Sequence, residues 1–176
     1  MNKIIWILCL LFSCGQTEQE LEPLDPALVL PADDNLSLSA KGYNGINLGD
    51  SITNNERLRL TNIENDEGSF SGYKLMHKEL GAVGYALPMS TNNELIGQIV
   101  IDMIGIETKE GISVGKTYAD LKTTYPKLKV YVSETDGITY ATSNGLHFRL
   151  DATSSSNKID QEPAASKKIL AIEIRK

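Results

Sequence analysis

The sequence predicts an α+β fold over residues 42–176, consisting of an antiparallel, sheet-rich domain with two short helices. Three observations predict it. Apolar and polar residues alternate in several short segments, hairpin turn signals separate some of these segments, and two Gly-Ile turns each lead into a short helical pattern. The composition is that of an ordinary globular domain, with 41% hydrophobic and 23% charged residues. The predicted order is a turn, a helix and several antiparallel strands, and this order occurs twice. Such an order is typical of an α+β domain.

Strands are indicated by alternation with a period of two, which places every second side chain on the same face. In the segment 146–151, Leu146, Phe148 and Leu150 are the inward residues. Asp136-Gly137 and Asn144-Gly145 are hairpin turn signals, because both central positions of such turns need residues that tolerate positive φ. The expected strands cover residues 71–76, 83–87, 96–104, 128–133, 137–142, 146–151 and 169–175.

The two helices are expected directly after two matching stretches, Gly45–Ser51 and Gly111–Thr117. Ser51 and Thr117 are suitable N-cap residues, and the glycines suit turns that need positive φ. The second helix should end before Pro126. Its core-facing residues, at helical spacing, are Tyr118, Leu121 and Tyr125.

The shared pattern Gly-Ile-x-aliphatic-Gly-x-Ser/Thr divides the domain into two possible related halves, residues 42–106 and 107–176. Two explanations stay open. The halves are a true internal repeat, or a seven-residue match with two glycines arises by chance from ordinary strand, turn and helix chemistry.

The N-terminus has the organisation of a bacterial signal peptide over residues 1–13. Lys3 is followed by an apolar run from Ile4 to Phe12, which is too short to span a bilayer, and then by a small residue, Ser13. The run Leu11, Phe12, Ser13 and Cys14 resembles a bacterial lipobox, in which the cysteine thiol accepts a diacylglyceryl group. The resemblance implies lipid attachment at Cys14. The alternatives are a secretory signal cut elsewhere or a short buried strand.

Residues 14–41 are expected to be an acidic, proline-containing tether, because Pro23, Pro26 and Pro31 disfavour a helix and the segment has little apolar surface to bury. It is either a plain spacer or a segment recruited by a basic partner. Without residues 1–13 the chain has 16 basic and 23 acidic residues, a net charge of −7, which argues against nucleic-acid binding. Its single remaining cysteine could form no internal disulfide.

No catalytic residue, cofactor or metal is expected. The two histidines, His77 and His147, lie in no metal-ligand pattern, and His147 is expected on the solvent face of its strand. Gly68–Gly72 has the outline of a nucleophile elbow but Phe70 in place of the nucleophile, and the glycine spacing before Gly115 does not fit a phosphate loop. Glu134 and Asp136 should be solvated in a turn.

The layout of residues 42–176 resembles that of the uncharacterised, envelope-stress-regulated small lipoproteins of Gram-negative bacteria that share a domain of unknown function. Three segments carry the resemblance: Ile99–Met103, Glu110–Leu121 and Lys168–Lys176. It implies an envelope location and a two-part α+β fold, and no known activity.

Together, these features predict a non-enzymatic lipoprotein of the cell envelope. We expect it to be held by its lipid at the outer membrane, facing the periplasm, where it binds a protein or another envelope component. Two alternatives are a periplasmic inhibitor or carrier module for a small ligand, and an unrecognised hydrolase.

Overall fold

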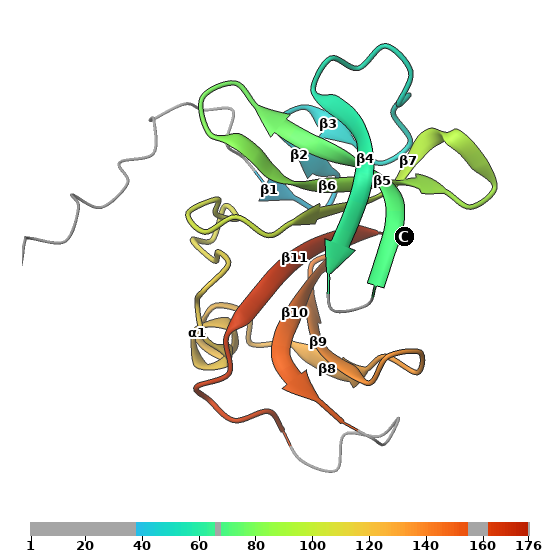
Figure 1. Cartoon of the computed structure of the whole chain (residues 1–176). Coiled ribbons are helices and arrows are strands. Elements are labelled where there is room, and N and C mark those ends of the chain that lie inside the picture. Colours follow the sequence, from blue (N-terminus) through green and yellow to red (C-terminus); the bar gives the residue numbers. More distant parts are fainter. Residues whose placement is uncertain (1–37, 66–67, 155–161, 176) are drawn as a thin grey trace, which may run out of the picture. The chain divides into compact units, whose positions relative to one another are not determined.

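The computed structural model describes residues 38–65, 68–154 and 162–175, and within them the chain forms eleven strands and one helix (Figure 1). These residues all belong to one unit of the chain, Ala32–Lys176. The predicted α+β class with two short helices is therefore wrong, because the described part of the chain is mostly β-structure with a single seven-residue helix.

Most of the strands belong to a large antiparallel sheet with the order β4-β5-β6-β7-β11-β10-β9-β8. The order is symmetric about the β7–β11 pair. Each half is an antiparallel meander, and the two fourth strands pair at the centre. The bounds are β4 (Leu58–Asn65), β5 (Gly68–His77), β6 (Gly81–Met89), β7 (Asn92–Ile101), β8 (Lys129–Val132), β9 (Ile138–Ser143), β10 (Leu146–Thr153) and β11 (Ile169–Arg175).

A small sheet precedes the large one and consists of β1 (Leu38–Ser39), β2 (Gly42–Tyr43) and β3 (Ile46–Asn47). Leu38 is 2% exposed and forms an isolated parallel bridge with Thr108. Residues 38–41 of the predicted tether are thus part of the folded domain.

The helix expected after Ser51 does not form. Ser51 makes a bridge to Leu95 instead, and the N–H of Ile52 donates to the carbonyl of Glu94 at 2.8 Å. Three residues after Ser51 stands Asn54, whose φ of +63° lies outside the helical region. The segment therefore turns and is bonded to the edge of β7 rather than winding into a helix.

The helix expected after Thr117 forms as α1 (Tyr118–Thr124). Thr117 is the N-cap of a capping box: its backbone N–H donates to the Asp120 carboxylate at 2.8 Å, and the Asp120 N–H donates to its hydroxyl at 3.3 Å. Tyr118 and Leu121 are buried, as the helical spacing predicts, and the Tyr125 ring packs against Phe148 at 5.6 Å.

The two Gly-Ile turns are bonded to the large sheet in the same way. The N–H of Gly49 donates to the carbonyl of Ile96 in β7 at 2.8 Å, and the N–H of Gly115 donates to the carbonyl of Ile169 in β11 at 2.9 Å. Both glycines have positive φ, +86° and +89°. The equivalence is one of geometry; descent of the halves from a single repeat stays a prediction.

The large sheet has a core on each face. On one face β7 and β11 direct Ile99, Ile101, Ile172 and Ile174 into the main core, which also contains α1 and the small sheet. On the other face a smaller apolar cluster contains Ile63, Tyr85, Val100 and Ala171. This second face also carries the polar side chains of the candidate site.

Candidate functional site

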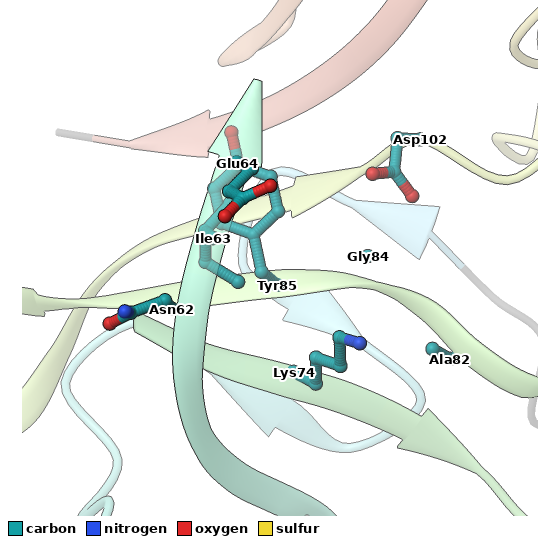
Figure 2. Close-up of a pocket in the computed structure, with 8 residues that line it drawn as sticks. All are labelled: Asn62, Ile63, Glu64, Lys74, Ala82, Gly84, Tyr85 and Asp102. Carbon is teal, nitrogen blue, oxygen red and sulfur yellow. The ribbon is translucent and has the colours of Figure 1, made fainter. Parts of the chain in front are cut away.

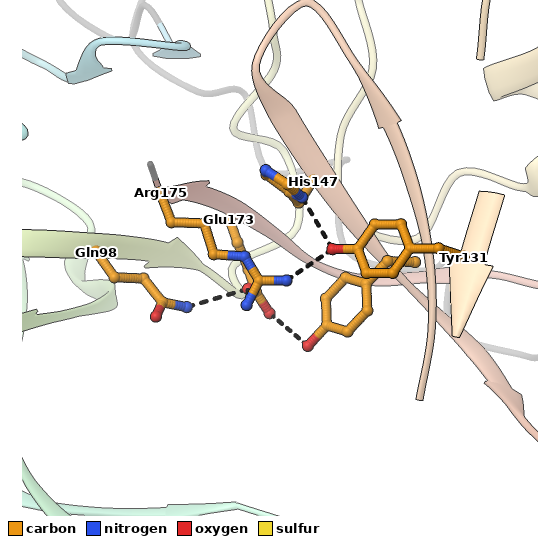
Figure 3. Close-up of polar contacts among 6 residues, drawn as sticks. Gln98, Tyr131, His147, Glu173 and Arg175 are labelled. Carbon is orange, nitrogen blue, oxygen red and sulfur yellow. Dashed lines mark hydrogen bonds and ion pairs between the residues drawn. The ribbon is translucent and has the colours of Figure 1, made fainter. Parts of the chain in front are cut away.

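A buried carboxylate, Glu173, lies at the centre of the large sheet, where β11 pairs with β7. Its side chain is 4% exposed. Gln98 of β7 donates to Oε2 at 3.0 Å and the hydroxyl of Tyr140 donates to Oε1 at 3.0 Å (Figure 3). The Arg175 guanidinium lies 3.4 Å from Oε2. Partners on three different strands, β7, β9 and β11, therefore meet on one carboxylate, as buried charges require.

A second part of this network links β11 to β8 and β10. Arg175 donates to the Tyr131 hydroxyl at 2.7 Å, and that hydroxyl lies 2.9 Å from Nδ1 of His147 (Figure 3). The Tyr131 ring stacks on Tyr140 at 5.4 Å, and the Arg175 guanidinium lies over the Tyr140 ring at 4.9 Å. Hydrogen bonds and ring contacts together fix the guanidinium in one place. We call Gln98, Tyr131, Tyr140, His147, Glu173 and Arg175 the Glu173 network.

The surroundings of His147 bear on the protonation of its imidazole. The Tyr131 hydroxyl accepts from Arg175, so its one proton can be donated to Nδ1 of His147 when that nitrogen carries no proton. Burial lowers the pKa of His147, and the positive charge of Arg175 lowers it further. Burial and the charge of Arg175 thus both favour the neutral imidazole.

Two cavities adjoin Arg175, each about 390 Å³ in volume, and both are lined by Leu48 and Arg175. We call them together the Arg175 groove. The first cavity adds Gln98 and a set of apolar side chains, and the second adds Lys41 and Asn47 from the small sheet and its first turn. The apolar set is Leu87, Pro88, Met89 and Ile96.

A separate cleft of about 320 Å³ lies on the first half of the sheet, between the end of β4 and strands β5 to β7. Figure 2 shows the carboxylates of Glu64 and Asp102 and the ammonium group of Lys74 around it. Burial raises the pKa of Asp102, and its own backbone hydrogen bond opposes that shift in part. The three charges give this cleft a net charge of −1.

The two histidines have structural partners. His77 is 6% exposed, and its Nδ1 accepts from the N–H groups of Glu79 and Leu80 at 3.2 Å each, which stabilises the turn between β5 and β6. His147 is half-buried rather than solvent-exposed, because its strand face packs against Tyr131. Glu134 and Asp136 are both exposed in the β8–β9 turn, where Asp136 accepts from the N–H of Ile138.

Sequence reasoning missed the Glu173 network. The last strand was expected from its alternation alone, and Glu173, which stands between Ile172 and Ile174, was not singled out. An acidic residue flanked by isoleucines on the central strand of a sheet was the available signal, since such a strand is covered on both faces.

The lipid-attachment residue Cys14 and the rest of the lipobox, Leu11, Phe12 and Ser13, lie outside the described residues. Among the residues that the structure describes, no helix is long and apolar enough to cross a membrane. In the same residues, no three His, Cys, Asp or Glu side chains gather as metal ligands would.

No family model matches the sequence, and no curated protein matches it. The fold is similar to the crystal structure of the uncharacterized protein yfeY from Escherichia coli, with a TM-score of 0.46 and 12% sequence identity. The alignment covers 80% of this chain and 99% of that chain. At this identity and TM-score the likeness assigns no function.

Proposed function

We propose that this protein is a lipid-anchored component of the bacterial cell envelope whose β-domain has a binding role and no catalytic one. The observation that carries the proposal is the N-terminal pattern: Lys3, a nine-residue apolar run, Ser13 and then Cys14. Acyl chains on Cys14 would hold the protein at a membrane, since each buried CH₂ contributes about 0.8 kcal/mol and two or three chains make release slow.

The proposed location is the outer membrane, facing the periplasm. Gly15 follows the cysteine, where an aspartate would favour retention at the inner membrane. The segment between Cys14 and Leu38 has room to hold the domain some tens of ångströms from the lipid surface, at roughly 3 Å per residue where extended.

A binding role is supported by the charged and polar groups of the second sheet face. The Glu173 network engages its histidine, tyrosines and carboxylate with one another, and two cavities of ligand size lie beside its arginine. The proposed partner is an envelope component, and crosslinking in intact cells followed by capture of the protein should recover the same partner reproducibly.

The anchor is tested by feeding cells an alkyne analogue of palmitate and comparing three forms of the protein. Wild type should be labelled, Cys14→Ser should not, and Cys9→Ser should be labelled like wild type because Cys9 lies within the apolar run. Intact-mass measurement should show a wild-type chain that begins at Cys14. An unlabelled wild-type protein that still begins at Met1 would exclude the anchor.

A further inference from the structure

We propose that the Arg175 groove binds a small anion that carries a short apolar group. The ligand class is a medium-chain carboxylate or phosphate monoester, with its charged head at Arg175 and its chain along Leu87–Met89. This inference deepens the binding role proposed above and rests on it, but it does not depend on the lipid anchor.

The Arg175 groove carries positive charge. The groove has a cationic side chain in each cavity, Arg175 in both and Lys41 in the second. On the same sheet face, Arg149 and Arg175 outnumber Glu173, so these three buried or half-buried groups sum to +1. The whole chain carries −6. A positive site on a negative protein attracts small anions to one place.

The Arg175 guanidinium is held in place and has donors that can bind an anion. Arginine has five N–H donors, and Arg175 directs Nη1 toward Glu173 and Nη2 toward the Tyr131 hydroxyl. Its remaining donors belong to a side chain that lines both cavities and is 31% exposed. Because the network already holds the group in place, an incoming carboxylate or phosphate orders little further, which favours binding.

One wall of the Arg175 groove is apolar. Leu87, Pro88 and Met89 are half-buried, so part of their apolar surface is open to the cavity. The pairing of β6 with β7 shifts at Pro88, and Gly97 lies opposite the shift. A Cβ on Gly97 would lie 2.7 Å from Cα of Met89, so the glycine permits this close approach of the two backbones. At about 390 Å³, each cavity has the size of a small-molecule site.

The cleft on the first half of the sheet has the opposite charge from the Arg175 groove. In the symmetric strand order, β7 and β11 are the corresponding fourth strands of the two halves. Asp102 directly follows β7 and Arg175 ends β11, so both residues lie at the ends of corresponding strands. The cleft at Asp102 carries −1 and the groove at Arg175 carries positive charge. A small anion should therefore bind in the Arg175 groove rather than in the cleft. Asp102→Asn changes a charge in the cleft alone and is the matched control for Arg175→Gln.

The test uses the full chain in non-ionic detergent, titrated calorimetrically with octanoate, octyl phosphate, octan-1-ol and acetate. Octanoate or octyl phosphate should bind saturably, and octanol and acetate at least about tenfold more weakly, because each lacks one half of the ligand. Preference for octyl phosphate would identify a phospholipid-type head, and preference for octanoate a free carboxylic acid; either supports the site. Partition into micelles is the same for all variants, so differences between variants report the groove.

Arg175→Gln should weaken binding of the anionic probe at least about tenfold, Lys41→Gln a few-fold, and Asp102→Asn not at all. Since Arg175→Gln also removes contacts within the Glu173 network, thermal unfolding of each variant is measured alongside. If Arg175→Gln does not fold, Lys41→Gln decides, because Lys41 is exposed. Wild type that binds octanoate and octyl phosphate no better than octanol, or a Lys41→Gln affinity equal to wild type, would overturn the proposal.

The tests of the lipid anchor and of the Arg175 groove have independent outcomes. Cys14→Ser should bind the anion as wild type does, whatever the palmitate labelling shows. Binding without labelling would refute only the anchor, and labelling without binding only the groove.

Discussion

Replacing Glu173 with alanine should destabilise the domain by about 3–5 kcal/mol, the range expected when one partner of a buried ion pair is removed. Three groups lose their acceptor: the Tyr140 hydroxyl at 3.0 Å, the Gln98 amide at 3.0 Å and the Arg175 guanidinium at 3.4 Å. Removing the side chain leaves a small void beside the Tyr140 hydroxyl and the Gln98 amide, and the positive charge of Arg175 loses its counter-ion.

Urea denaturation followed by circular dichroism measures this loss as a free energy of unfolding. For a domain of roughly 150 residues, 1 kcal/mol shifts the melting temperature by about 2–4 °C, so Glu173→Ala should melt about 6–20 °C below wild type. Tyr140→Phe removes only one hydroxyl and should cost about 1.5–3 kcal/mol, the range for a hydrogen bond to a charged group. Glu173→Gln keeps the shape of the side chain and one acceptor oxygen. Its loss of stability should lie between those of Tyr140→Phe and Glu173→Ala.

The double variant Glu173→Ala/Tyr140→Phe tests whether the two residues act together. Because they share a hydrogen bond, the combined loss should be smaller than the sum of the single losses by at least about 0.5 kcal/mol. A Glu173→Ala variant within about 1 kcal/mol of wild type would refute the account of Glu173 as a buried charge that depends on these partners.

Two further predictions concern the cap of α1 and the neutral histidine. Thr117→Ala should destabilise the domain by about 1 kcal/mol because it breaks the capping box with Asp120, whereas Ser51→Ala should change the urea midpoint by much less, since Ser51 caps no helix; equal losses would contradict this assignment. Because burial, followed by Arg175, lowers the pKa of His147, the unfolded chain binds a proton below about pH 6.5 that the folded chain resists, so stability is complete above that pH and falls as pH falls. The drop in urea midpoint from pH 7.5 to pH 5.5 should be smaller in His147→Gln than in wild type, and an identical drop in both would show that His147 is not responsible.

Much of the large sheet could be predicted, because seven of its strands have strong local signals. Alternation in 146–151 places Leu146, Phe148 and Leu150 in the core, and all three are at most 3% exposed. At the Asn144-Gly145 turn both residues have positive φ, +53° and +79°, as a tight hairpin requires. Local chemistry of this kind acts within a few residues and is therefore visible in the sequence.

The strand β4 and the small sheet were missed for a different reason. In β4 the polar residues Thr61 and Asn62 interrupt the pattern, and Leu60 is 71% exposed, so apolar alternation does not reveal the strand. The small strands β1 to β3 have two residues each, which is too short for any periodic signal. Both depend on pairing with partners elsewhere in the fold.

Apart from the signal at Glu173, the candidate site was beyond prediction because its members come from distant strands. Gln98 and Glu173 are 75 residues apart, and Tyr131 and Arg175 are 44 residues apart. Which polar residues meet depends on the strand order, and the symmetric order with β11 at the centre does not follow from local patterns. The predicted solvent exposure of His147 was wrong for this reason, since the Tyr131 ring that covers it lies on β8.

The central pairing of β7 with β11 has a consequence for how the protein folds. Each half closes by hairpins between neighbouring strands, which form in microseconds, whereas the seam joins segments some 75 residues apart and must await a much larger loop closure. Until that seam closes, two strands with unpaired backbone groups face solvent and can pair with another copy of the chain. Slow refolding and concentration-dependent aggregation should therefore share one origin, and substitutions at the seam should affect both.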